Sequence, residues 1–182
     1  MDLGRLVLRL VLGDLFVGHG TQKLFGWFGG QGPQGTSEMM ESVGLRPGRL
    51  NALAAGATEA AGGALLAAGT ATPLAAAGIT GVMVTAVRRI HWQNGLWNTS
   101  GGYEYNAVIV AALAALVEAG PGRWSLDSMR GRVRRGSGWA LTALALGTLG
   151  SEVATRLVAA APGHEVHARE EPTSETALRA AA

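Results

Sequence analysis

Apolar stretches long enough to cross a lipid bilayer recur along this chain. The first runs from Leu3 to Phe28, and a membrane-spanning helix needs roughly 20 apolar residues. Four or five such runs are separated along the sequence, and 48% of the 182 residues are hydrophobic. We therefore predict an all-α integral membrane protein, a four-helix transmembrane bundle with a possible fifth helix on its C-terminal side.

Ionisable side chains lie inside these apolar stretches. His19 and Lys23 lie in the later part of the first stretch, and Glu59 lies near the middle of the second. A charge within a membrane segment is costly, and a residue retained there is a candidate for a functional site. We therefore expect the bundle to have a polar interior.

Turn-forming residues separate the predicted helices. The four predicted membrane helices span residues 3–28, 50–68, 72–92 and 103–119. In the loop after the first of them, we expect Ser37 to cap a short helix that lies on the membrane surface. Thr72 and Pro73 are predicted to form the cap and first turn of the third membrane helix.

The C-terminal part of the chain differs in composition from the first 127 residues. We predict a four-helix membrane domain over 1–127, followed at 128–161 by a basic cytoplasmic loop and the possible fifth helix. Glu152 and Arg156 in this helix are four residues apart in the stabilising order. The helix either spans the membrane or lies on its surface or in solution. Residues 162–182 have the composition of a disordered tail.

Arginines set the predicted orientation. The loop after the fourth helix is the most basic in the chain and is therefore predicted to be cytoplasmic, which by alternation puts the N-terminus in the cytoplasm too. Because no globular domain accompanies these arginines, we expect a lipid bilayer rather than a nucleic acid as their partner. The cluster consists of Arg123, Arg130, Arg132, Arg134 and Arg135.

The predicted topology collects the ionisable side chains in the outer half of the bundle. On the first helix, His19 and Lys23 share a face with Arg9 and Phe16, and on the second helix Glu59 shares a face with Gly56 and Gly63. Two interpretations follow. The side chains hold a quinone-like headgroup and relay a proton, or they pair with each other and fix the helix register. The candidate ligand-binding or proton-handling residues are His19, Lys23, Glu59, His91 and Glu104.

Other kinds of chemistry have little support in the sequence. The chain has no cysteine, so it carries no thiolate nucleophile and no Cys-ligated metal or iron–sulfur centre of its own. His19 and His91 come from different helices, as haem ligation would require, but two histidines without a second motif are a weak signal. We expect no metal or haem, and we assign no catalytic residue.

A fixed order of short motifs runs from Leu3 to Asp127. The motifs are His19-Gly20-Thr21-Gln22-Lys23-Leu24-Phe25, Glu59-Ala60-Ala61-Gly62-Gly63-Ala64-Leu65-Leu66, His91 followed by Gly95, Gly101-Gly102-Tyr103-Glu104, and Gly120-Pro121-Gly122-Arg123-Trp124-Ser125-Leu126-Asp127. Their series resembles the DoxX family of small bacterial membrane proteins. The resemblance implies a four-helix bundle in the bacterial cytoplasmic membrane. Family relatives include a subunit of a thiosulfate:quinone oxidoreductase, and others are linked to membrane complexes that handle oxidative stress and thiols.

Two functions are therefore expected from different classes. In the first, the chain is a non-autonomous subunit of a membrane redox complex that binds a quinone-like molecule, while a membrane or membrane-associated partner carries the redox centre. His19, Lys23 and Glu59 are then the headgroup and proton ligands, and His91 and Glu104 lie at the outer mouth. In the second, the chain is a membrane scaffold or assembly factor without ligand or catalysis. A transporter is less favoured because inverted repeats and broken helices are missing.

Overall fold

The computed structural model describes residues 2–160, and all regular secondary structure in that range is helical. The predicted all-α class is therefore confirmed for this part of the chain. Within the described residues, one helical segment, Thr72–Asn94, is by itself both long and apolar enough to cross a membrane. The seven α-helices are α1 (Asp2–Phe25), α2 (Gly32–Ser42), α3 (Gly48–Ala68), α4 (Thr72–Ala86), α5 (Glu104–Ala119), α6 (Leu126–Met129) and α7 (Ser137–Ala160).

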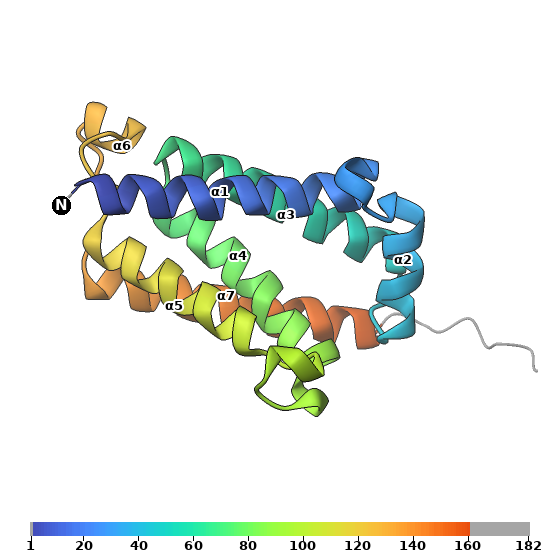
Figure 1. The fold of residues 1–182 in the computed structure, drawn as a ribbon. Helices are drawn as coiled ribbons and strands as arrows, with labels where there is room; N and C mark the ends of the chain where they lie inside the picture. The colour runs from blue at the N-terminus through green and yellow to red at the C-terminus, as the bar shows by residue number, and fades with distance from the viewer. Residues whose placement is uncertain (1, 161–182) are drawn as a thin grey trace, which may run out of the picture.

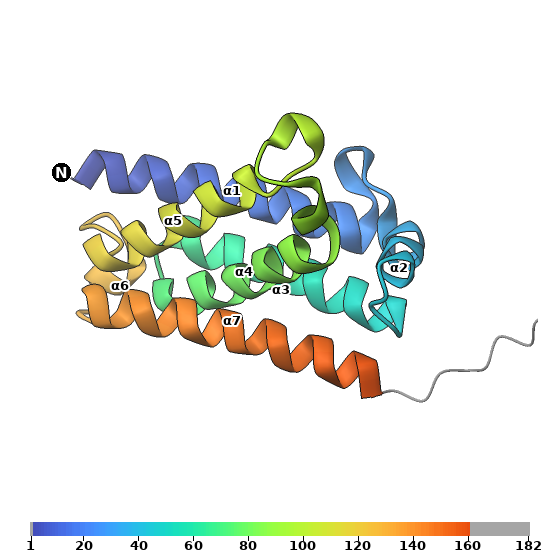
Figure 2. The ribbon, with the colours of Figure 1, turned by 90° about the horizontal axis from the view of Figure 1, so that it is seen from below.

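The five longest helices form a bundle in which successive helices run in opposite directions, so that α1, α4 and α7 run one way and α3 and α5 the other. α1 packs along α3, α7 packs along α4 and α5, and α4 crosses between the two groups (Figure 1). The N-terminus and α6 lie at one end, here called the α6 end, and α2 lies at the opposite α2 end (Figure 1). Seen from below, α7 runs along the whole bundle from the α6 end (Figure 2). The helix expected over 139–161 thus belongs to the same packed body as α4 and α5.

Glycines bring α1 and α3 into close contact. A Cβ atom on Gly20 would lie 2.5 Å from the carbonyl oxygen of Gly56, and one on Gly63 would lie 2.5 Å from that of Gly13. The seven-residue spacing within each helix keeps both glycines on one face. Small residues of this kind allow helices in lipid to approach closely. The face that Glu59 was predicted to share with Gly56 and Gly63 is buried at all three positions.

A buried apolar core fills the space between the two groups of helices. Its largest side chains come from α1, α3, α4 and α5. Because a protein interior is close-packed, this core fixes the depth of the polar groups on α1 and α3 relative to the other helices. Its principal members are Phe16, Leu66, Ile79, Leu113, Leu116 and Val117.

Two predicted helix starts are wrong. α2 begins at Gly32, five residues before Ser37, and Pro33 lies in its first turn. The fixed φ of proline suits a first turn, so the helix starts there, and Ser37 lies inside it rather than capping it. Thr72 is the first residue of α4, and Ala71 is the capping residue, without a side-chain hydrogen bond to the helix.

The third predicted membrane helix changes its winding near its end. The α-helix α4 ends at Ala86 and continues as a π-helix over Val87–His91 and then as a 3₁₀ turn over Trp92–Asn94. A π-helical turn holds one more residue than an α-helical turn and is often found near functional sites. The change therefore occurs in the segment that contains Arg88 and His91. Residue 1 and the tail over 162–182 lie outside the described residues.

Candidate functional site

Lys23 and Glu59 form an ion pair between α1 and α3. Lys23 Nζ donates to Glu59 Oε2 at 2.6 Å, and the side chains are 22% and 4% exposed. Lys23 Nζ also lies 3.5 Å from the carbonyl oxygen of His19. A carboxylate this deeply buried needs a partner, because its desolvation is costly. The lysine supplies that partner across the helix pair.

Glycine at position 56 makes room for this pair. A Cβ on Gly56 would lie 3.1 Å from Lys23 Cβ and 2.9 Å from Leu24 Cγ. Gly56 is three residues before Glu59 on the same face of α3. The lysine side chain therefore passes over a residue without a side chain before it reaches the carboxylate.

His19 lies one turn before Lys23 on α1, and its ring contacts that of Phe16, with centroids 6.2 Å apart. Its side chain is exposed, and Nδ1 is 3.2 Å from Gln22 Oε1. The ring lines a groove of about 600 Å³ together with Asp14, Leu15, Gly18 and Phe28, among others. Neither Lys23 nor Glu59 lines this groove. Among the described residues no hydrogen bond joins the imidazole to the Glu59 carboxylate, and Asp14 lines the groove with His19.

His91 and Glu104 hold the segment that joins α4 to α5. His91 Nδ1 is 2.7 Å from the carbonyl oxygen of Gly101, and Glu104 Oε2 accepts a hydrogen bond from the backbone N–H of Asn98 at 3.0 Å. Trp92 stacks on Tyr103, with ring centroids 5.6 Å apart. These contacts close a compact connection, and among the described residues no hydrogen bond or ion pair joins His91 or Glu104 to Lys23 or Glu59.

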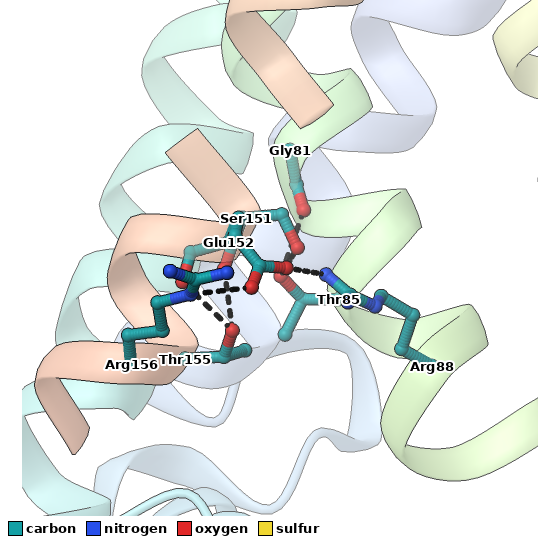
Figure 3. A network of polar contacts seen from close by, with 7 residues as sticks. All are labelled: Gly81, Thr85, Arg88, Ser151, Glu152, Thr155 and Arg156. Atoms are coloured by element: carbon teal, nitrogen blue, oxygen red, sulfur yellow. Dashed lines mark hydrogen bonds and ion pairs between the residues drawn. The ribbon is translucent and has the colours of Figure 1, made fainter. Parts of the chain in front are cut away.

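A polar network joins α7 to α4 and to the π-helical turn that follows it (Figure 3), and the sequence predicted one part of this network. Glu152 forms ion pairs with Arg88 of the π-helical turn and with Arg156, the latter at 2.6 Å. The predicted pairing of Glu152 with Arg156 is thus confirmed. Beside it, the hydroxyls of Thr85 and Ser151 are 2.7 Å apart. The sequence pattern did not indicate α7 as the partner of Thr85.

Arg9 is buried, which the sequence did not predict. Its side chain is 1% exposed, and Nη2 donates to the carbonyl oxygen of Trp124 at 2.8 Å. Within residues 2–160, Nε and Nη1 find no hydrogen-bond partner. The guanidinium lies against Gly69, where a Cβ would overlap it. Arg9 thus ties α1 to two connections at the α6 end, the α3–α4 turn and the segment before α6.

The described residues contain no group of three or more His, Asp or Glu side chains arranged to hold a metal ion. The candidate residues fall into three polar features. These are the buried Lys23–Glu59 pair, the groove beside His19 and the closed connection at His91 and Glu104. The first two lie on α1, within two helical turns of each other.

Part of the chain matches a known protein family. Residues 4–92 match the family model for DoxX. The chain belongs to the DoxX family. No curated protein and no solved structure gave a match. The resemblance inferred from the motifs is confirmed, over a shorter part of the chain than 3–127.

The DoxX match contains most of the candidate site. It covers α1, α2, α3 and α4 and ends at Trp92. His19, Lys23, Glu59 and His91 lie within it, whereas Glu104 and α7 lie beyond it. Membership in this family makes the chain a membrane-associated protein.

Proposed function

We propose that this DoxX family protein is a multi-pass subunit of a redox complex in the bacterial cytoplasmic membrane, and that it binds a quinone-like molecule. The groove beside His19 is the observation that carries the proposal. It is a recess of about 600 Å³ on the outer side of α1. A lipid-soluble ligand could enter it from the bilayer without crossing the packed core.

Exposed apolar side chains support the membrane-spanning arrangement. Val7 and Val11 on α1 are 50% and 51% exposed, and Leu141 and Leu149 on α7 are 66% and 60% exposed. Large apolar surfaces of this kind are typical of contact with lipid or with another protein. At 1.5 Å per residue, a helix of 24 residues is about 36 Å long, enough for a hydrocarbon core of about 30 Å. α1 and α7 therefore have the length and the outer surface of membrane helices.

The chemistry of the groove suits a flat ring with carbonyl groups. Leu15 and Phe28 supply apolar walls, and His19 and Gln22 supply hydrogen-bonding groups. When His19 Nδ1–H donates to Gln22 Oε1, the neutral imidazole keeps Nε2 as an acceptor. Nε2 can then take a proton from a quinol hydroxyl, and in the charged form it can return a proton to a quinone oxygen.

The Lys23–Glu59 pair has a supporting part in this proposal. It lies on the α3 side of the same helix, and Lys23 Nζ is 3.5 Å from the carbonyl oxygen of His19. We assign it the second proton-handling role and the task of holding α1 in register with α3. Because the chain has no cysteine, a thiol or Cys-ligated redox centre would have to belong to a partner protein.

Filling the groove tests the ligand. Gly18 lines the groove, and a Cβ there meets no atom within 4 Å. Gly18→Leu should therefore abolish retention of quinone, measured by mass spectrometry of the gently purified protein, without lowering the melting temperature. Gly4→Leu is the matched control, because Gly4 is on the same helix, is equally open and is outside the groove. Equal quinone retention in both variants would refute the groove as the binding site.

A scaffold without ligand is the second candidate, and one observation favours it. Lys23 and Glu59 neutralise each other at 2.6 Å, as a purely structural pair would. Under this alternative, Glu59→Gln leaves a buried lysine unpaired and lowers stability, and adding Lys23→Met restores much of the loss. Under the redox proposal, Glu59→Gln also impairs quinone-dependent electron transfer, and the second substitution does not restore that activity.

A further inference from the structure

The α6 end of the bundle contains a small cavity with an unusual concentration of arginines. The cavity measures about 200 Å³, less than the roughly 300 to 1,000 Å³ of pockets for drug-sized ligands. Three parts of the chain contribute arginines to its lining: α1, the segment before α6 and the segment before α7. The polar lining residues are Asp2, Arg5, Arg123, Ser128 and Arg135.

Asp2 is the one carboxylate in this lining. Asp2 Oδ1 accepts from Arg5 Nη2 at 2.7 Å and from the backbone N–H of Arg123 at 3.1 Å. The N–H of Arg123 holds the pKa of Asp2 below its usual value, and Arg5 adds to the effect. Asp2 therefore stays ionised at neutral pH. Three positive charges and one negative charge leave the cavity lining with a formal charge of +2.

Tryptophans mark the depth of this end in a membrane. Arg123 lies over the ring of Trp124 at 5.7 Å, and Arg134 lies over that of Trp139 at 5.4 Å. Both indoles are exposed, at 52% and 42%. Tryptophan concentrates at the level of the lipid headgroups, where its apolar ring and polar N–H are both accommodated. The cavity thus lies at the level where lipid phosphates are found.

We propose that this cavity binds the phosphate of an anionic phospholipid, with phosphatidylglycerol as the representative headgroup. A guanidinium binds two phosphate oxygens at once, and among the described hydrogen bonds the guanidinium groups of Arg123 and Arg135 make none to Asp2. The Ser128 hydroxyl adds a neutral donor at the cavity wall. Basic pockets between membrane helices on the cytoplasmic side recognise acidic headgroups by this chemistry. This proposal does not depend on quinone binding.

Native mass spectrometry of the delipidated full-length protein tests the proposal. Phosphatidylglycerol, phosphatidylcholine and inorganic phosphate are titrated separately. We expect phosphatidylglycerol to bind more tightly than phosphatidylcholine, and Arg135→Gln to weaken it about fivefold, since one basic residue near a lipid surface contributes about 1 kcal/mol. Arg135 is the residue to change because it is exposed and makes no contact with Asp2 among the described hydrogen bonds.

Arg130→Gln is the matched control. Arg130 is an exposed arginine at the same end that does not line the cavity. Phosphatidylglycerol binding should be unchanged in this variant. An equal loss in both variants would show that only the overall charge attracts lipid and would overturn the site. Equal binding of both lipids, or inorganic phosphate binding as tightly as phosphatidylglycerol, would also overturn it.

Discussion

The contact between α1 and α3 predicts a large difference between two glycine substitutions on the same helix. In Gly20→Ala the new methyl group would lie 2.5 Å from the carbonyl oxygen of Gly56 and 2.7 Å from Ala60 Cβ. Carbon atoms normally pack at about 3.5 to 4.0 Å, so the helices would have to separate by about 1 Å. In Gly18→Ala the methyl group meets no atom within 4 Å.

Comparing Gly20→Ala with Gly18→Ala gives the size of the expected loss of stability. Both variants add the same methyl group to α1, so the gain in helix propensity cancels, and the overpacking cost of about 1 to 3 kcal/mol remains. We take the upper end, about 3 kcal/mol, because a backbone carbonyl cannot change rotamer to make room. For a chain of 150 to 250 residues, about 2 to 4 °C accompany each kcal/mol. Gly20→Ala should therefore melt about 6 to 12 °C below Gly18→Ala.

A thermal-shift assay in a mild detergent measures this difference, with Gly4→Ala as a second open control on α1. The helix contact also sets the Lys23–Glu59 distance of 2.6 Å, so Gly20→Ala should weaken that pair as well. If Gly20→Ala melts with the two controls, then α1 and α3 are not in backbone contact, and the geometry argued for the ion pair fails with it.

Three other predictions concern the ends and the fifth helix. Gly69→Ala should destabilise the protein by more than the roughly 1 kcal/mol of a strained left-handed residue, because the methyl group would also overlap Arg9; chemical or thermal unfolding beside wild type checks this. Ser151→Ala should cost about 0.5 to 1.5 kcal/mol by removing the 2.7 Å contact with Thr85, whereas no loss would mean that α7 is not docked there. Topology reporters should place the segment after Arg135 in the cytoplasm and the loop at 29–35 outside, and the opposite result would reverse the proposed orientation.

Helical periodicity accounts for what the sequence predicted well. The face that joins Glu59 to Gly56 and Gly63 follows from three- and four-residue spacing, and the structure buries it against α1. The same spacing put Lys23 within reach of Glu59, and the two form an ion pair. It also grouped His19 with Lys23, but His19 is exposed beside the groove. Spacing fixes the direction of a Cα–Cβ bond but not the rotamer that carries the ring elsewhere.

Long-range partners were beyond the reach of the sequence pattern. Ala77, Gly81 and Thr85 are small residues at four-residue spacing on α4, but nothing in this pattern specifies which helix covers them. In the structure, α7 does, and Gly147 lies with Gly81 at the contact. Arg9 was placed on the correct face of its helix, yet its burial depends on Gly69 and on the backbone of Trp124. Both contacts join residues more than 50 positions apart, and no local rule predicts them.

The π-helical turn at Val87–His91 contains one residue more than an α-helical turn would. Removing a single residue from this turn would allow an uninterrupted α-helix, and the residues on either side would keep nearly the same relative orientation, because the wider turn takes up the extra residue. A deletion within the α-helical part of α4 would instead rotate everything after it by about 100° and shift it by about 1.5 Å. His91 would then lose the carbonyl oxygen of Gly101, which it now reaches at 2.7 Å. A one-residue deletion should therefore be tolerated in the π-helical turn and not in the turns before it.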